Sequence, residues 1–152
     1  MIIDFEKLKN EVIFNLENNR TWVLSTASDG NVSSRSMSII NKGLNIYFQT
    51  NKCYIKHNQI NKNNNVALCF NNISIEGVAE EIGDWKDEKN KELMELYKSV
   101  HLSSFNAYGL LDGQVVYKVT PKKIKIWKYI NGNPIRQNLY VNEEIAEELD
   151  FM

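Results

Sequence analysis

Hydrophobic residues recur along the chain with two different periods, which predict helices in some stretches and strands in others. Residues 4–18 place them three or four positions apart, which predicts an amphipathic helix that begins after the N-cap residue Asp4. Residues 20–40 read as two strand-like runs joined by Asp29-Gly30, a typical sequence for a tight hairpin. A turn at residues 41–43 leads into a further strand at residues 44–50, where hydrophobic and polar residues alternate.

The second half of the chain continues this mixture of short helices and strands. Gly77 interrupts a strand pattern, which predicts a bulge or a close approach of two backbones. Pro121 separates two strand patterns, and Asn131-Gly132 predicts another turn. The acidic C-terminal residues 142–151 are expected to form a short helix. The other expected elements are helices within residues 54–65 and 87–100, and strands at residues 66–72, 73–83, 113–120, 122–130 and 135–141.

Strands grouped as hairpins, with helices at the start, middle and end, predict a mainly β protein with α additions. The expected architecture is an antiparallel barrel formed by a single domain, residues 1–152. Helices do not alternate regularly with strands, and no glycine-rich strand-to-helix turn occurs. Both observations argue against a parallel dinucleotide-binding sheet.

Composition narrows the choice of function. Hydrophobic residues make up 43% and charged residues 24% of the 152 residues, which is ordinary for a soluble globular protein. A net charge of −1 gives no general attraction for nucleic acid. Two cysteines without paired spacing argue against disulfides and a thiolate metal site. An early-charged N-terminus and the lack of a long apolar run argue against a signal peptide and a membrane span, so we expect a cytoplasmic protein.

Arg35 stands out among its neighbours, because residues 33–39, SSRSMSI, otherwise have the short polar and hydrophobic side chains of a strand. Thr50 and Lys56 flank a turn into the next helix, and the free N–H groups at a helix N-terminus favour anions. An arginine, a threonine hydroxyl and a lysine at such a place can hold a phosphate group. The alternative is that Arg35 and Lys56 are ordinary surface charges, and spacing alone does not decide between the two.

Other residue types give weaker signals. The two histidines lie far apart without a Cys or carboxylate at metal-ligand spacing, and His57 is expected to be a solvated helix residue. Cys69, in the hydrophobic run VALCF, is expected to be buried. Trp127 and Tyr129 share one face of a late strand, where they either pack in the core or an interface or border a flat aromatic ligand.

Four stretches carry a family resemblance that runs from about Leu16 to Tyr129. They are TWVLSTASDGNVSSRSMSI, LNIYFQTNKCYIKHNQINKNNNVALCF, ISIEGVAE and VTPKKIKIWKY. In order and pattern they resemble the pyridoxamine 5′-phosphate oxidase-like, FMN-binding split barrels. Such proteins have a hairpin that ends in an Arg-x-Met or Arg-x-Val strand. A second strand ends in Thr, and a turn with Ser and Lys follows it. The matching residues here are Arg35 and Met37, then Thr50 and Lys56.

The resemblance implies an antiparallel split barrel that binds FMN between the two subunits of a homodimer. It implies that Arg35 and Lys56 bind the FMN phosphate and that Thr50 contacts the ring or the ribityl chain. It also implies that the backbone around Met37 and Ser38 faces the flavin ring, while serines such as Ser36 keep the strand small where the cofactor lies against it.

The sequence departs from the family pattern at several positions. The serine of the phosphate turn is Tyr54 here, and the arginine that often follows it is Ile55. The glutamine that contacts the ring in the oxidases falls at Asn72, while Trp127 matches a tryptophan that contacts the cofactor from the partner subunit. The substrate-binding Arg and His after that tryptophan have no clear counterpart. Their loss argues against true pyridoxamine phosphate oxidase activity.

Three functional hypotheses follow from these observations. The first is an FMN-dependent oxidoreductase that moves electrons between a reduced nicotinamide and a small acceptor. The second is a non-catalytic module that binds FMN, another flavin such as deazaflavin, or haem. The third is a nucleic-acid-binding barrel in which Tyr47, Phe48 and Trp127 stack on bases, which the near-neutral charge disfavours.

Overall fold

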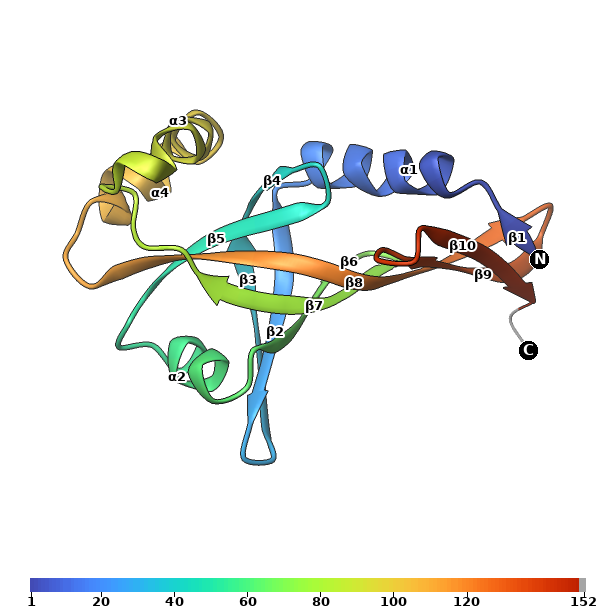
Figure 1. Cartoon of the computed structure of the whole chain (residues 1–152), viewed down its shortest axis with the longest axis horizontal. Helices are drawn as coiled ribbons and strands as arrows, with labels where there is room; N and C mark the ends of the chain where they lie inside the picture. The colour runs from blue at the N-terminus through green and yellow to red at the C-terminus, as the bar shows by residue number, and fades with distance from the viewer. Residues whose placement is uncertain (151–152) are drawn as a thin grey trace.

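One bent antiparallel sheet of ten strands dominates the computed structural model, which describes residues 1–150 (Figure 1). The strands and helices follow in the order β1 Ile2–Ile3, α1 Phe5–Asn18, β2 Thr21–Ser28, β3 Asn31–Ser38, β4 Ile40–Lys42, β5 Asn45–Asn51, α2 Ile55–Lys62, β6 Asn65–Phe70, β7 Ile73–Glu81, η1 Glu88–Asn90, α3 Lys91–Val100, α4 Leu102–Ser104, η2 Phe105–Gly109, β8 Gln114–Ile130, β9 Asn133–Tyr140 and β10 Ile145–Asp150.

The long strand β8 joins the two halves of the sheet. It pairs with β7 and β9 along most of its length and with β5 near its start. The strand order is β1-β10-β9-β8-β7-β6-β2-β3, so β3 ends the sheet and pairs only with β2. Within residues 1–150, β3 and β5 form no ladder with each other, and the barrel stays open between them. The fold is therefore an antiparallel barrel, as the strand pattern predicts, and a split one, as the family resemblance implies.

The first helix and the first hairpin form as predicted. The Asp4 side chain accepts a hydrogen bond of 3.1 Å from the Lys7 amide, which caps α1. Asp29 and Gly30 both have positive φ values, 51° and 79°, which lets a two-residue turn follow the twist of the strands it joins. The hairpin β2–β3 extends away from the rest of the molecule in Figure 1.

Gly77 marks a bulge, as predicted, but the strand opposite it is continuous. Gly77 pairs with Pro121 while Glu76 pairs with Lys123, so β8 carries one extra residue here. A Cβ atom on Gly77 would lie 2.6 Å from the Thr120 carbonyl oxygen, so the backbones approach too closely for a side chain. The prediction of two separate strands around Pro121 is wrong, because the bulge accommodates a residue that lacks an N–H group.

The C-terminal segment is a strand and not the predicted helix. β10 pairs with β9 along its whole length and with β1 on its other edge. Ala146 is buried, and the Glu147 carboxylate accepts hydrogen bonds from Asn138 and from the Tyr140 hydroxyl. These pairings outweigh the helix propensity of the sequence, which is only a weak preference. Phe151, the end of the predicted helix, lies outside the described residues.

Two hydrophobic clusters support the cleft described below. One fills the barrel and the space beneath α1, with Leu16, Leu24, Phe48, Ile75 and Val119 among its buried members. The other lies between β5, β8 and the helical segment α3–η2, and includes Tyr47, Trp85, Tyr97, Phe105 and Val116. Because Tyr47 and Phe48 are both buried, β5 is covered on both faces. Among residues 1–150 no helix combines the length and apolar character needed to cross a membrane.

Candidate functional site

The open seam of the barrel forms a cleft of about 320 Å³. Ser36, Met37 and Ser38 border it from β3, Thr50 from β5, and Tyr54 and Lys56 from the start of α2. Six of the residues proposed from the sequence therefore line one cleft, although they come from three elements. Because β3 is an edge strand, its outward N–H and C=O groups at this cleft are not used by the sheet.

Arg35 and Lys56 form a pair of like charges beside the cleft. Arg35 precedes Ser36 and does not itself line the cleft, whereas Lys56 does. Burial lowers the pKa of Lys56 from its ordinary value, and the nearby positive charge of Arg35 lowers this pKa further. Burial also lowers the pKa of Arg35. Neither side chain forms an ion pair with any of residues 1–150, so the pair presents uncompensated positive charge suited to an anion.

Further polar groups at the same place lack partners. No side chain caps α2, whose N-cap residue is Tyr54, so the N–H groups at its start have no side-chain acceptor. The buried Thr50 hydroxyl has no hydrogen-bond partner within the described part of the chain. A buried polar atom without a partner costs free energy, which a bound ligand can recover.

Asn72 and Trp127 lie elsewhere. They border a separate pocket of about 230 Å³ at the junction of β6, β7 and β8. The Asn72 side-chain amide donates to the Trp127 carbonyl oxygen at 2.8 Å, and the Trp127 side chain is 47% exposed. Because Trp127 is this exposed, it does not pack in the core of this chain. The structure does not bring these two residues into the cleft.

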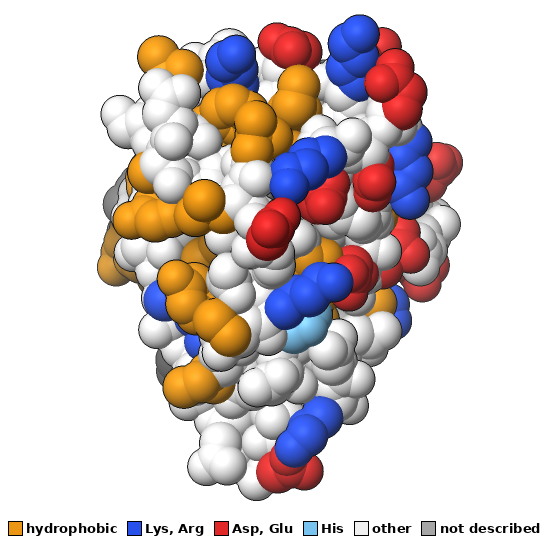
Figure 2. Space-filling view, turned by 90° about the vertical axis from the view of Figure 1, so that its left-hand side faces the viewer, with side chains coloured by type: hydrophobic (Ala, Val, Ile, Leu, Met, Phe, Trp, Pro, Cys, Tyr) orange, Lys and Arg blue, Asp and Glu red, His pale blue; other side chains and the backbone are white. Residues whose placement is uncertain are grey.

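Several residues that line the cleft have no signal in the sequence. They belong to β5, the helical segment α3–η2 and the start of β8, and they are Gln49, Tyr97, Ser104, Tyr108 and Gln114. The Gln49 amide donates to the Gly109 carbonyl oxygen at 2.8 Å, which ties the helical segment to β5. Figure 2 faces this end of the molecule and shows hydrophobic side chains gathered along one side of it, with charged side chains along the other. The amphipathic pattern of residues 87–100 predicts a helix but does not indicate that the following residues reach a cleft.

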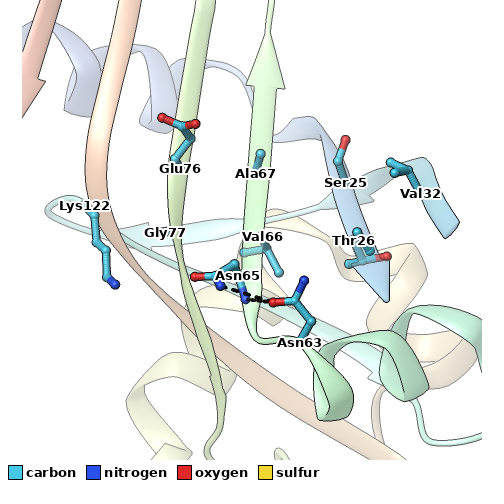
Figure 3. Close-up of a pocket in the computed structure, with 11 residues that line it drawn as sticks. Ser25, Thr26, Val32, Asn63, Asn65, Val66, Ala67, Glu76, Gly77 and Lys122 are labelled. Carbon is cyan, nitrogen blue, oxygen red and sulfur yellow. Dashed lines mark hydrogen bonds between the residues drawn. The ribbon is translucent and has the colours of Figure 1, made fainter. Parts of the chain in front are cut away.

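A larger pocket of about 450 Å³ lies on the outer face of β2, β6 and β7 (Figure 3). Its lining is mostly short side chains such as Ser25, Ala67 and Gly77. The cation at its border, Lys122, is exposed to solvent, unlike the partly buried Lys56. This pocket is larger than the cleft, but it is not the better candidate for an anion site, because an exposed cation gains little free energy from pairing with an anion.

Two expectations about single residues are wrong. His57 is buried rather than solvated, and its Nδ1 atom lies 2.6 Å from the Tyr117 hydroxyl. Burial, with the charge of Glu81 adding to it, raises the pKa of Tyr117 to about 12, so the hydroxyl keeps its proton. The Asn61 side-chain amide, a donor, lies 3.1 Å from His57 Nε2, which leaves the proton of a neutral ring on Nδ1, facing the Tyr117 hydroxyl. Cys69 is exposed rather than buried, because it lies on the outward face of β6.

The model of the pyridoxamine 5′-phosphate oxidase family matches residues 8–128, well over half of the chain. The chain belongs to this family. No curated protein sequence matches it significantly.

Solved structures with the same fold cover most of the chain. General stress protein 26 from Bacillus anthracis strain Sterne is 22% identical, with a TM-score of 0.63, over 77% of this chain and 91% of that one. ChuZ from Campylobacter jejuni is 12% identical, with a TM-score of 0.76, over 95% of this chain and 63% of that one. A pyridoxamine 5′-phosphate oxidase-related, FMN-binding protein from Nostoc punctiforme is 13% identical, with a TM-score of 0.64, over 93% and 95%. At these identities the likeness is one of fold.

Tyr54 stands where the pattern of the pyridoxamine 5′-phosphate oxidase family has a serine, and its ring contacts Lys56. Lys56 Nζ lies 4.6 Å from the centre of the Tyr54 ring. An aromatic face attracts a cation, so the Tyr54 ring helps to hold the Lys56 side chain at the border of the cleft.

Proposed function

We propose that this member of the pyridoxamine 5′-phosphate oxidase family binds FMN along the open seam of its barrel. The observation that carries the proposal is the pair of partly buried cations, Arg35 and Lys56, without an acidic partner among residues 1–150. A phosphate dianion supplies the missing negative charge, and the uncapped start of α2 adds N–H donors.

The rest of the cleft suits the flavin and its ribityl chain. The free edge of β3 at residues 36–38 offers backbone donors and acceptors, with the small side chains of Ser36 and Ser38 beside them. The unpartnered Thr50 hydroxyl is available for the ring or the ribityl chain. The residues present therefore fit FMN.

We propose that a second copy of the chain completes the cofactor-binding site. The cleft, at about 320 Å³, is near the lower end of the range of about 300–1,000 Å³ for small-molecule sites. Asn72 and the half-exposed Trp127 occupy a different pocket of the same chain, so they can reach a cofactor in this cleft only from a partner subunit. A homodimer with the flavin at its interface uses both groups of residues.

The proposed activity is an oxidoreductase that moves electrons between a reduced nicotinamide and a small acceptor. Bound FMN supplies the electron-transfer chemistry. The residues of this chain bind the phosphate, orient the ring against β3 and exclude water from one ring face. None of these tasks requires a side chain that acts as a strong base.

An absorbance and fluorescence titration of the apo-protein with FMN tests the proposal. We expect Arg35→Ala and Lys56→Ala each to weaken FMN binding by about ten- to a hundredfold, because each removes a charge-assisted hydrogen bond. Lys122→Ala, which removes an exposed lysine at the other pocket, is the matched control and should leave the affinity unchanged. Unchanged affinity in both cleft variants would refute the assignment of the phosphate site.

Two further measurements separate the hypotheses. Oxidation of a reduced nicotinamide that depends on an added acceptor indicates catalysis, whereas bound FMN without turnover indicates a flavin carrier. A parallel titration with haemin separates a haem module from a flavoprotein, because only the former gives a stoichiometric Soret band.

A further inference from the structure

Arg35 is held from one side by a chain of hydrogen bonds that the phosphate site does not itself require. Its Nη1 atom donates to the Thr26 hydroxyl at 2.9 Å and to the Leu24 carbonyl oxygen at 3.3 Å. Among residues 1–150, its Nε and Nη2 atoms have no hydrogen-bond partner. One edge of the guanidinium group is therefore anchored, and the other nitrogens remain free for a ligand.

The anchor continues into α2. The Thr26 hydroxyl accepts from Arg35 and donates to Gln59 Oε1 at 2.5 Å. Gln59 Nε2 in turn lies 3.3 Å from the Asn31 carbonyl oxygen and 3.4 Å from the Ser33 hydroxyl. Thr26 and Gln59 are only 1% and 5% exposed, so this chain of hydrogen bonds is shielded from water.

The arrangement connects the two elements that carry the cations. Gln59 lies three residues after Lys56, so the two side chains share a face of α2. Thr26 and Arg35 belong to the hairpin β2–β3. The chain from Arg35 through Thr26 to Gln59 thus ties the hairpin to the helix, next to two positive charges that repel each other.

We propose that Thr26 and Gln59 are positioning residues that hold Arg35 beside Lys56 before a ligand binds, so that the phosphate site is already assembled in the apo-protein. This inference rests on the proposed function. A buried hydroxyl that both accepts and donates leaves Arg35 little rotational freedom, and binding to a preassembled site loses less entropy than binding to a mobile one. Gln59, a buried amide on a short polar helix, has this role rather than a role in the hydrophobic core.

The test uses Thr26→Val, which keeps the shape of the side chain and removes the hydroxyl. FMN and riboflavin, which share the ring and ribityl chain and differ in the phosphate, are titrated into the full-length protein. We expect Thr26→Val to lower the affinity for FMN about five- to tenfold and to leave the affinity for riboflavin unchanged. Thr26→Ser, which restores the hydroxyl, should recover the affinity for FMN. Gln59→Met is the second variant, for use if Thr26→Val fails to fold, and it should give the same selective loss.

A double-mutant cycle separates positioning from a structural role. In the Arg35→Ala background, Thr26→Val should cause no further loss of FMN affinity, because the residue that it positions is already gone. An equal loss for FMN and riboflavin, or a loss that persists without Arg35, would overturn the inference. Suppose that the wild type prefers FMN over riboflavin and that Arg35→Ala abolishes that preference. If Thr26→Val and Gln59→Met then keep the preference, the phosphate site stands and only the positioning role of Thr26 and Gln59 is refuted. If the wild type shows no preference for FMN, the proposed phosphate site fails and the inference with it.

Discussion

Lys56→Met tests whether Lys56 serves cofactor binding rather than folding. We expect this substitution to weaken FMN binding and to leave the stability of the apo-protein almost unchanged. Methionine has a similar length and no charge. The loss of one charge-assisted hydrogen bond to phosphate, about 1.5–3 kcal/mol, corresponds to a loss of FMN affinity of roughly 10- to 150-fold. The apo-protein loses only the contact between Lys56 Nζ and the half-exposed Tyr54 ring, about 0.5–1 kcal/mol.

That loss of stability is offset within the same variant. Methionine also removes the burial of a charge and its repulsion by Arg35, the two causes that lower the pKa of Lys56. The free energy of unfolding of the apo-protein should therefore change by less than about 0.5 kcal/mol or increase. Urea denaturation of the apo-protein followed by circular dichroism measures the stability, and quenching of flavin fluorescence measures the affinity.

Lys62→Met is the matched control on the same helix. Lys62 forms an exposed ion pair of 3.1 Å with Asp29, remote from the cleft lining, so its loss should cost at most about 1 kcal/mol of stability and leave FMN affinity unchanged. A loss of more than about 1 kcal/mol of stability in apo Lys56→Met, or wild-type affinity for FMN in this variant, would refute the reasoning.

The pH dependence follows from the same residue. The charged form of Lys56 binds phosphate, and its pKa in the free protein is lowered by burial and by Arg35. FMN affinity should therefore fall as the pH rises through this lowered pKa. The apo-protein should instead gain stability in the window between the lowered pKa and the ordinary value, because there the unfolded chain binds more protons than the folded one. Lys56→Met should remove both effects.

Three further substitutions test the fold and the cleft. Gly77→Ala should destabilise the protein by about 1–3 kcal/mol in urea denaturation, because the new Cβ atom would lie 2.6 Å from the Thr120 carbonyl oxygen. Wild-type stability of this variant would contradict the close approach of the two backbones. Tyr117→Phe should cost about 1–3 kcal/mol, because it leaves the buried His57 Nδ1 without its hydrogen-bond partner. An unchanged unfolding midpoint would show that this hydrogen bond contributes nothing. Thr50→Val should leave the stability of the apo-protein unchanged within about 0.5 kcal/mol but weaken FMN binding in a fluorescence titration. A loss of stability with unchanged FMN affinity would show that the hydroxyl serves folding instead.

Features set by neighbouring residues were predictable from the sequence. The capped helix after Asp4 and the tight turn at Asp29-Gly30 depend on a few adjacent residues, and both occur where expected. The bulge at Gly77 is also readable, because a glycine inside a strand pattern usually marks a close backbone approach. The grouping of Thr50 and Lys56 with residues 36–38 in one cleft follows the spacing and the family resemblance.

Features set by distant partners were not predictable in the same way. The acidic C-terminal segment forms a strand because β9 and β1 pair with it, and a single sequence does not show those partners. His57 is buried because Tyr117, 60 residues later, lies against α2. Gln59 and Thr26, 33 residues apart, carry no pattern that predicts their hydrogen bond.

The sequence by itself determined the local turns and caps, the alternation that makes a mainly antiparallel protein, and the identity of the residues suited to an anion. Only the tertiary structure decided that Arg35 and Lys56 lie near each other without an ion-pair partner among residues 1–150, and that Trp127 lies outside the cleft. The reason is physical. Backbone conformation responds to adjacent residues, whereas burial and the pairing of charges depend on which distant strands and helices come into contact.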